Sequence, residues 1–246
     1  MVWRLALAAA PLAFLLGTGL AGEADPGGER WYVWRLRNQP CGYFHVVRKA
    51  TQERDAPVLL EHDFVVLYRG RRLSLHMRTW CRDDACLTPV RIASKGEGDD
   101  ELGTFEAAVA WDAAGGGLLK TQVGQRKVEL RLPERTVTDF ALFEIVARLP
   151  FKEGEAFEFN SLEASELNLK PNHRIAYLGQ EEVTLGGESR KLHKFEQTGQ
   201  GIRPARYWVS GRHELVRILM DDRKEFLLAS REEALEAAEQ AASQPR

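Results

Sequence analysis

The feature that most constrains the fold is an alternation of apolar and polar residues with a period of two, which runs through most of the chain. In the segment from Trp31 to Leu36, Tyr32 and Trp34 share one face and Val33 lies on the other. Glycine-containing turns separate roughly a dozen such segments, and little between them has helical periodicity. The pattern therefore predicts a mainly β protein with a long, curved antiparallel sheet, a half-barrel, because parallel strands need long crossover connections.

One segment in the middle of the chain departs from this period. Thr136 and Asp139 have the spacing of a capping box, and apolar residues then recur at helical spacing, with Phe140 and Phe143 among them. Pro150 stops the pattern. We expect a helix over residues 137–149 whose apolar face packs in the concavity of the sheet, because buried aromatic and aliphatic side chains each stabilise a fold by about 1.5–3 kcal/mol.

A second capping box, formed by Ser230 and Glu233, predicts a C-terminal helix that extends to about Ala242. Its one large apolar side chain is Leu235, so we expect this helix to project from the domain or to dock weakly.

The first residues have the three parts of a secretory signal peptide: an early positive charge at Arg4, an apolar run from Leu5 to Leu16, and small residues up to Ala24. The alternative is a membrane anchor, but the run is shorter than the ~20 residues that a spanning helix needs, and Pro11 interrupts it. We expect export to the periplasm or the extracellular space after cleavage before Asp25. The predicted organisation is a signal peptide of residues 1–24, a single antiparallel β domain of residues 25–230, and a C-terminal helix and tail of residues 231–246.

The charge distribution argues against a nucleic-acid partner. Lysine and arginine number 34 and aspartate and glutamate 36, which gives a net charge of -2. The two signs alternate along most segments, and no long basic run is present.

Three cysteines occur in the sequence. Cys81 and Cys86 bracket the tip of a predicted hairpin, so we expect a disulfide between them, with Cys41 left as a free thiol. The alternative is a metal site completed by His76, but the spacing is a poor zinc pattern, and we expect no metal.

The residues that could support catalysis are scattered. The six histidines occur singly, without the spacing of metal ligands on a helix, and each has the character of a surface or structural histidine. Cys41 and His45 would lie more than ~13 Å apart on one strand, too far for a thiol and its base. We therefore expect no catalytic residues, no cofactor and no enzymatic activity.

Two hairpins carry a resemblance to a known family. The aromatic strand from Trp31 to Arg37 with its turn into Gly42-Tyr43, and the segment from Tyr207 to Arg217, resemble the opening and closing hairpins of an uncharacterised family of exported bacterial β-rich domains. Such domains occur alone or ahead of a transglutaminase-like domain, and they are distantly similar to periplasmic lipoprotein-localisation carriers. The resemblance covers residues 29–230, although Ser210 stands where the family commonly has an acid. The family has no established catalytic residues, so none is carried over.

A half-barrel with a helix in its concavity can either hold an apolar ligand or be packed solid. We expect an exported, non-enzymatic domain that binds an apolar or lipid-like ligand, or a lipidated partner, with Trp34, Phe140, Phe143 and Trp208 at the mouth of the site. The alternative is an envelope protein-interaction module with a solid core and no ligand, which docks a protein partner through a sheet edge or the terminal helix. A cavity of a few hundred Å³ lined by those aromatic residues would distinguish the two.

Overall fold

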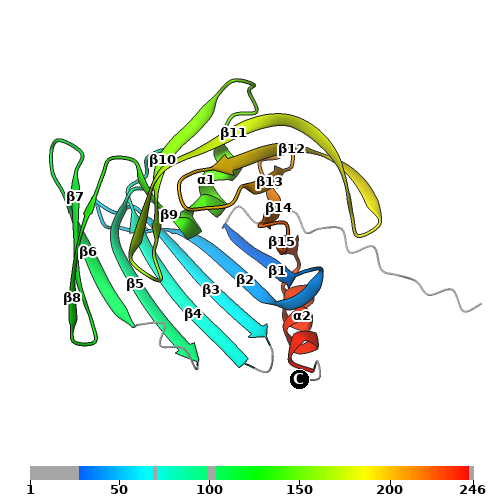
Figure 1. Ribbon diagram of the computed structural model, residues 1–246, viewed down its shortest axis with the longest axis horizontal. Helices are drawn as coiled ribbons and strands as arrows, with labels where there is room; N and C mark the ends of the chain where they lie inside the picture. The colour runs from blue at the N-terminus through cyan, green and yellow to red at the C-terminus, as the bar shows by residue number, and fades with distance from the viewer. Residues whose placement is uncertain (1–27, 69–70, 99–103, 244–246) are drawn as a thin grey trace, which may run out of the picture.

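The computed structural model describes residues 28–68, 71–98 and 104–243, and these residues form one continuous, strongly curved sheet (Figure 1). The strands are β1 (Glu29–Leu36), β2 (Gln39–Ala50), β3 (Val58–Tyr68), β4 (Arg71–Cys81), β5 (Pro89–Gly98), β6 (Phe105–Trp111), β7 (Gly117–Val123), β8 (Arg126–Leu132), β9 (Thr136–Thr138), β10 (Ala156–Glu163), β11 (Asn168–Leu185), β12 (Glu188–Thr198), β13 (Ala205–Val209), β14 (Leu215–Met220) and β15 (Lys224–Ala229). The predicted mainly β half-barrel is confirmed. The sheet closes nearly far enough to form a barrel.

Strands that are consecutive in the sequence are neighbours in the sheet, as expected for a meander, except that β1 pairs with β15 and that β8 and β9 are not paired. The strand order runs β8-β7-β6-β5-β4-β3-β2-β1-β15-β14-β13-β12-β11-β10-β9. Antiparallel pairing of β1 with β15 joins the two halves, with Trp31 opposite Ala229, while β8 and β9 form the two edges. Short turns can therefore make almost every connection.

The helical segment in the concavity is shorter than the sequence predicts. Residues Thr136–Thr138 form β9, which pairs in parallel with β10, and the 3₁₀ turn η1 (Asp139–Ala141) and helix α1 (Leu142–Arg148) follow. Thr136 donates its hydroxyl to the carbonyl of Pro133 at 2.7 Å. The expected start at residue 137 is wrong because pairing with β10 extends the backbone there. The end is confirmed, since Leu149 is extended immediately before Pro150.

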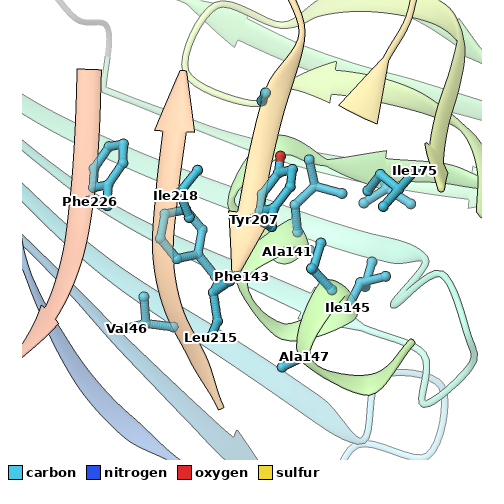
Figure 2. Close-up of a cluster of buried hydrophobic side chains, with 14 of the residues drawn as sticks. Val46, Ala141, Phe143, Ile145, Ala147, Ile175, Tyr207, Leu215, Ile218 and Phe226 are labelled. Atoms are coloured by element: carbon cyan, nitrogen blue, oxygen red, sulfur yellow. The ribbon is translucent and has the colours of Figure 1, made fainter. Parts of the chain in front are cut away.

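The main core lies between α1 and the concave face of the sheet (Figure 2). Phe143 lies at its centre, with its ring centroid 4.4 Å from that of Phe44, 5.3 Å from that of Tyr32 and 5.6 Å from that of Phe226. Leu215 and Ile218 of β14 lie beside it. The helix is therefore part of the hydrophobic core and does not lie loosely over the sheet.

An ion pair also fastens α1 to the sheet. Glu144, 5% exposed, pairs with Arg30 of β1, and Arg148 approaches its other oxygen at 3.7 Å. A buried carboxylate needs such a partner, because an unpaired buried charge is strongly destabilising.

Helix α2 (Arg231–Ser243) begins at the predicted capping box. The Ser230 amide donates to the Glu233 carboxylate at 2.8 Å, and the Glu233 amide donates to the Ser230 hydroxyl at 3.1 Å. The expectation that this helix projects or docks weakly is wrong. Ala234 and Ala237 are buried against Val33 of β1, because alanine lets the helix backbone approach the sheet closely, while Leu235 stays exposed.

The expected signal peptide of residues 1–24 lies outside the described residues. Within the ranges that the structure describes, no helix combines the length and the apolar character that crossing a bilayer requires.

Candidate functional site

A cavity of about 960 Å³ lies on the concave side of the sheet, between α1 and the strands that follow β10. Its apolar wall includes Leu142 and Phe143 from α1, Ala205 from β13 and Ile218 from β14. Leu36, at the end of β1, extends this wall towards the opening. The volume lies within the range of ligand sites in proteins, roughly 300–1,000 Å³.

The adjoining wall is polar and hydrogen-bonded, and it begins at Tyr207, the partner of Ile218 in the β13–β14 ladder. Gln197 of β12 donates from Nε2 to Nδ1 of His173 at 2.9 Å, and the Tyr207 hydroxyl donates to Oε1 of Gln197. His173 and Tyr207 are each 2% exposed, and both line the cavity. Because Nδ1 of His173 accepts, this arrangement corresponds to a neutral imidazole with its proton on Nε2. Burial lowers the pKa of His173, which favours that neutral form.

Asp139 of η1 also lines the cavity. Its carboxylate accepts a hydrogen bond from the Ala164 amide at 3.2 Å, yet burial dominates and raises its pKa to about 7. The pKa of Tyr207 is raised by burial and, secondarily, by the negative charge of Asp139, so its phenol remains a donor. At neutral pH a carboxyl group with such a pKa is partly protonated and therefore partly uncharged. The negative charge of this wall is then smaller than a count of its carboxyl groups indicates.

The sequence predicted four residues at the mouth of the site, and the structure does not bring them together. Phe143 lines the cavity. Phe140 instead stacks on Phe44 and His62, and Trp34 packs edge-on against Phe64 at 5.7 Å, so both lie in the core beside the cavity.

Trp208 was placed incorrectly, because it lies on the outer face of the sheet. It packs with Val183, Leu192 and Val216, its indole nitrogen donates to Glu181 at 2.7 Å, and the Arg217 guanidinium lies 4.6 Å from its ring centroid. The preceding residue, Tyr207, has the inward position that sequence reasoning gave to Trp208. The alternation of residues in a strand shows that Tyr207 and Trp208 point to opposite faces of the sheet. Both are large aromatic residues, so the alternation does not show which of the two faces lies inside the barrel.

The expected Cys81–Cys86 disulfide is also not formed. All three cysteines are buried free thiols. The Asp84 carboxylate organises the loop instead, accepting from the amides of Cys86 and Thr88 at 3.0 Å each, while the Cys81 thiol points to the Thr79 carbonyl. The expectation that Cys41 is a free thiol agrees with the structure.

Cys41 and His45 do not share one face of β2, although the regular spacing of a strand would place them on the same face. The pairing register between β1 and β2 shifts next to Cys41, whose side chain lines the cavity, while His45 lies on the outer face. The neighbouring Gly42 is held close to β3, where a Cβ atom would lie 1.9 Å from the Val65 carbonyl oxygen.

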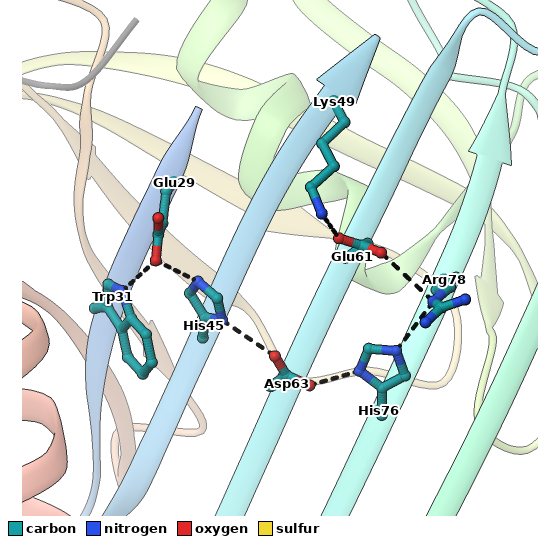
Figure 3. Close-up of polar contacts among 8 residues, drawn as sticks. All are labelled: Glu29, Trp31, His45, Lys49, Glu61, Asp63, His76 and Arg78. Carbon is teal, nitrogen blue, oxygen red and sulfur yellow. Dashed lines mark hydrogen bonds and ion pairs between the residues drawn. The ribbon is translucent and has the colours of Figure 1, made fainter. Parts of the chain in front are cut away.

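The outer face carries a polar network that the sequence did not predict (Figure 3). His45 contacts Glu29 through Nε2 at 3.0 Å and Asp63 through Nδ1 at 3.1 Å, and His76 contacts Asp63 at 2.6 Å. Hydrogen bonds from His45 and then His76 lower the pKa of Asp63 to about 2. Adjacent strands align these residues, since His45 and His76 both lie opposite Asp63 in the ladder. Within the described ranges no group of histidine, cysteine, aspartate and glutamate residues is arranged to hold a metal ion.

The fold and the cavity together define a barrel-like antiparallel β protein with an internal site that is half apolar and half polar. In comparisons with known proteins, no family model matches the chain and no curated protein matches it significantly.

Proposed function

We propose that this protein is a non-enzymatic binding protein that holds an apolar or lipid-like ligand, or the lipid group of a lipidated partner, inside its half-barrel. The observation that carries the proposal is the cavity of about 960 Å³ against Leu142, Phe143 and Ile218. Protein interiors are otherwise close-packed, so a space of this size next to apolar side chains supports the binding of a ligand there.

The polar wall is better suited to recognition than to catalysis. His173 is hydrogen-bonded to the Gln197 amide rather than to a carboxylate, and Tyr207 is bonded to the same amide. An amide bridge fixes side-chain orientation, but it does not assemble a general base next to a nucleophile. Export to the periplasm or the cell exterior is part of this proposal and rests on the N-terminal sequence pattern.

The cavity supports ligand binding over the alternative of an interaction module, which was expected to have a solid core. Of the four aromatic residues expected around such a cavity, Phe143 is the one that lines it. Two measurements test the proposal. Native mass spectrometry of the full chain purified from its own host is expected to show a copurifying lipid. The neutral apolar dye N-phenyl-1-naphthylamine is expected to bind and to be displaced by long-chain alcohols.

A space-filling variant makes the dye measurement specific to the cavity. Ala205→Trp places an indole in the cavity and is expected to abolish dye binding, whereas Ala108→Trp on the exposed outer face of β6 is expected to leave it unchanged. Ala205→Leu serves as a milder version, and thermal unfolding verifies that each variant is folded. Absence of dye binding by the unmodified protein, together with absence of a copurifying lipid, would contradict the proposal.

A further inference from the structure

The lining of the cavity has an excess of positive charge, although the whole chain is slightly acidic. Five basic side chains line it, against three carboxyl groups. One of those carboxyls is Asp139, whose raised pKa leaves it partly uncharged near neutral pH. Another, Glu163, is paired with Lys170 inside the cavity. The third carboxyl, Asp221, lies in the turn before β15 together with Arg223. Four basic residues remain against this one carboxylate, and we call these four the basic rim: Arg37, Arg203, Arg223 and Lys224.

The basic rim is assembled from three separate turns at one end of the barrel. Arg37 lies between β1 and β2, Arg203 between β12 and β13, and Arg223 and Lys224 at the start of β15. The Arg37 amide donates to the Arg223 carbonyl at 2.7 Å, which holds two of these turns side by side. Residues far apart in the sequence are therefore gathered at one opening.

The side chains of the basic rim are exposed, and among the described residues none of them forms an ion pair with a carboxylate. Basic residues nearby do have such partners: Arg206 contacts both Glu196 and Asp222. Four basic side chains against the single carboxylate of Asp221 leave a net positive charge at this opening, and an anion placed among them relieves their mutual repulsion.

Apolar side chains connect the rim with the interior. Met220 is 39% exposed at the end of β14, and Ile202 is half-buried next to Arg203. Further in, Ile218 and Phe143 continue this surface. Apolar side chains thus line the same cavity both at the rim and at the inner wall.

We propose that the cavity selects amphiphiles with an anionic head, a carboxylate or a phosphate, which binds at the basic rim while the apolar chain lies against Phe143 and Ile218. This inference rests on the proposed function, because it specifies the ligand of the same cavity.

The test compares ligands of equal chain length that displace N-phenyl-1-naphthylamine from the full-length protein at neutral pH and low salt. Dodecanoate and dodecyl phosphate are expected to bind about tenfold or more tightly than dodecanol, and the advantage is expected to shrink at high salt because exposed charges are screened. Dodecylammonium is expected to bind more weakly than dodecanol. Dodecanoate and lysophosphatidylglycerol then distinguish a free fatty acid from a phospholipid as the source of the anionic head.

Charge-removal variants locate the effect. Arg203→Gln, Arg223→Gln and Lys224→Gln combined are expected to reduce the affinity for dodecanoate to that for dodecanol, without changing the affinity for dodecanol. Arg126→Gln, Lys127→Gln and Arg131→Gln combined remove the same charge from the exposed strand β8 at the sheet edge and are expected to change neither.

The outcomes separate the two proposals. If all four dodecyl compounds bind with equal affinity, or if the β8 variant has the same effect as the rim variant, the anionic-head inference is wrong while the ligand-binding function stands. If neither the dye nor any amphiphile binds, the proposed function fails and this inference fails with it.

Discussion

Tyr207 and Trp208 are adjacent in β13, yet they serve opposite faces of the sheet: the Tyr207 hydroxyl donates to Gln197 inside the cavity, and the Trp208 indole donates to Glu181 at 2.7 Å on the outside. Tyr207→Phe leaves the buried carbonyl oxygen of Gln197 without its donor and is expected to lower the free energy of unfolding by about 1–3 kcal/mol. It is also expected to change dye affinity. Trp208→Phe is the matched control, expected to destabilise the fold without altering dye binding. Equal effects of the two variants on binding would contradict the assignment of faces.

Phe140 and Phe143 form a second matched pair. Both rings pack on Phe44, but Phe143 lines the cavity and Phe140 stacks beside His62. Truncation of either to alanine is expected to cost roughly 3–5 kcal/mol of stability, because each loses core contacts. Phe143→Ala is expected to change dye affinity as well, whereas Phe140→Ala is not. Chemical unfolding and dye titration of both variants provide the comparison.

The carboxyl of Asp139 is expected to make stability decrease with rising pH. Burial raises its folded-state pKa to about 7, above the ordinary value of 3.8, so between these values the folded protein binds more protons than the unfolded chain. The stabilising contribution of protonated Asp139 to the free energy of unfolding is therefore fully present below about pH 4, and it is lost as the pH rises through 7. Asp139→Asn is expected to remove this dependence and to be more stable than the unmodified protein at pH 8, by about 1–3 kcal/mol. Unfolding curves recorded between pH 4 and pH 8 give the free energy of unfolding as a function of pH. If this pH dependence is the same in Asp139→Asn as in the unmodified protein, the prediction is contradicted.

The ion pair between Arg30 and Glu144 is expected to hold α1 in place. Glu144→Gln removes the carboxylate that Arg30 pairs with, and Arg30→Gln leaves the buried carboxylate with only the longer contact to Arg148 at 3.7 Å, so each change is expected to cost about 2–4 kcal/mol. The double variant is expected to cost clearly less than the sum of the two. A double-mutant cycle by urea unfolding determines the coupling, and additive effects would show that the pair does not contribute.

The three cysteines are expected to be free thiols in the purified protein. Burial raises the pKa of the Cys81 thiol, and the same effect raises that of Cys86, so both thiolates are scarce and react slowly. Alkylation after unfolding without reductant, followed by mass spectrometry, is expected to label all three residues. Labelling of Cys41 alone would establish the disulfide that the hairpin spacing indicates.

Local signals in the sequence predicted much of the fold. Strand alternation and glycine-containing turns indicated the antiparallel meander, Pro150 marked the end of α1, and Ser230 with Glu233 marked the start of α2. These features depend on contacts between residues a few positions apart. The start of α1 was mispredicted because Thr136 and Val137 pair with β10, more than 20 residues later in the chain.

The sequence by itself determined the class of fold, because backbone periodicity and capping are local properties of a chain. Tertiary structure alone decided which face of β13 is inside, where the cavity lies, and that His173, Gln197 and Tyr207 meet in its wall. It also brought Arg37, Arg203 and Arg223 to one opening. The physical reason is that curvature of the sheet and the packing of α1 against it set these distances, and both depend on how strands from opposite ends of the chain pair through β1 and β15.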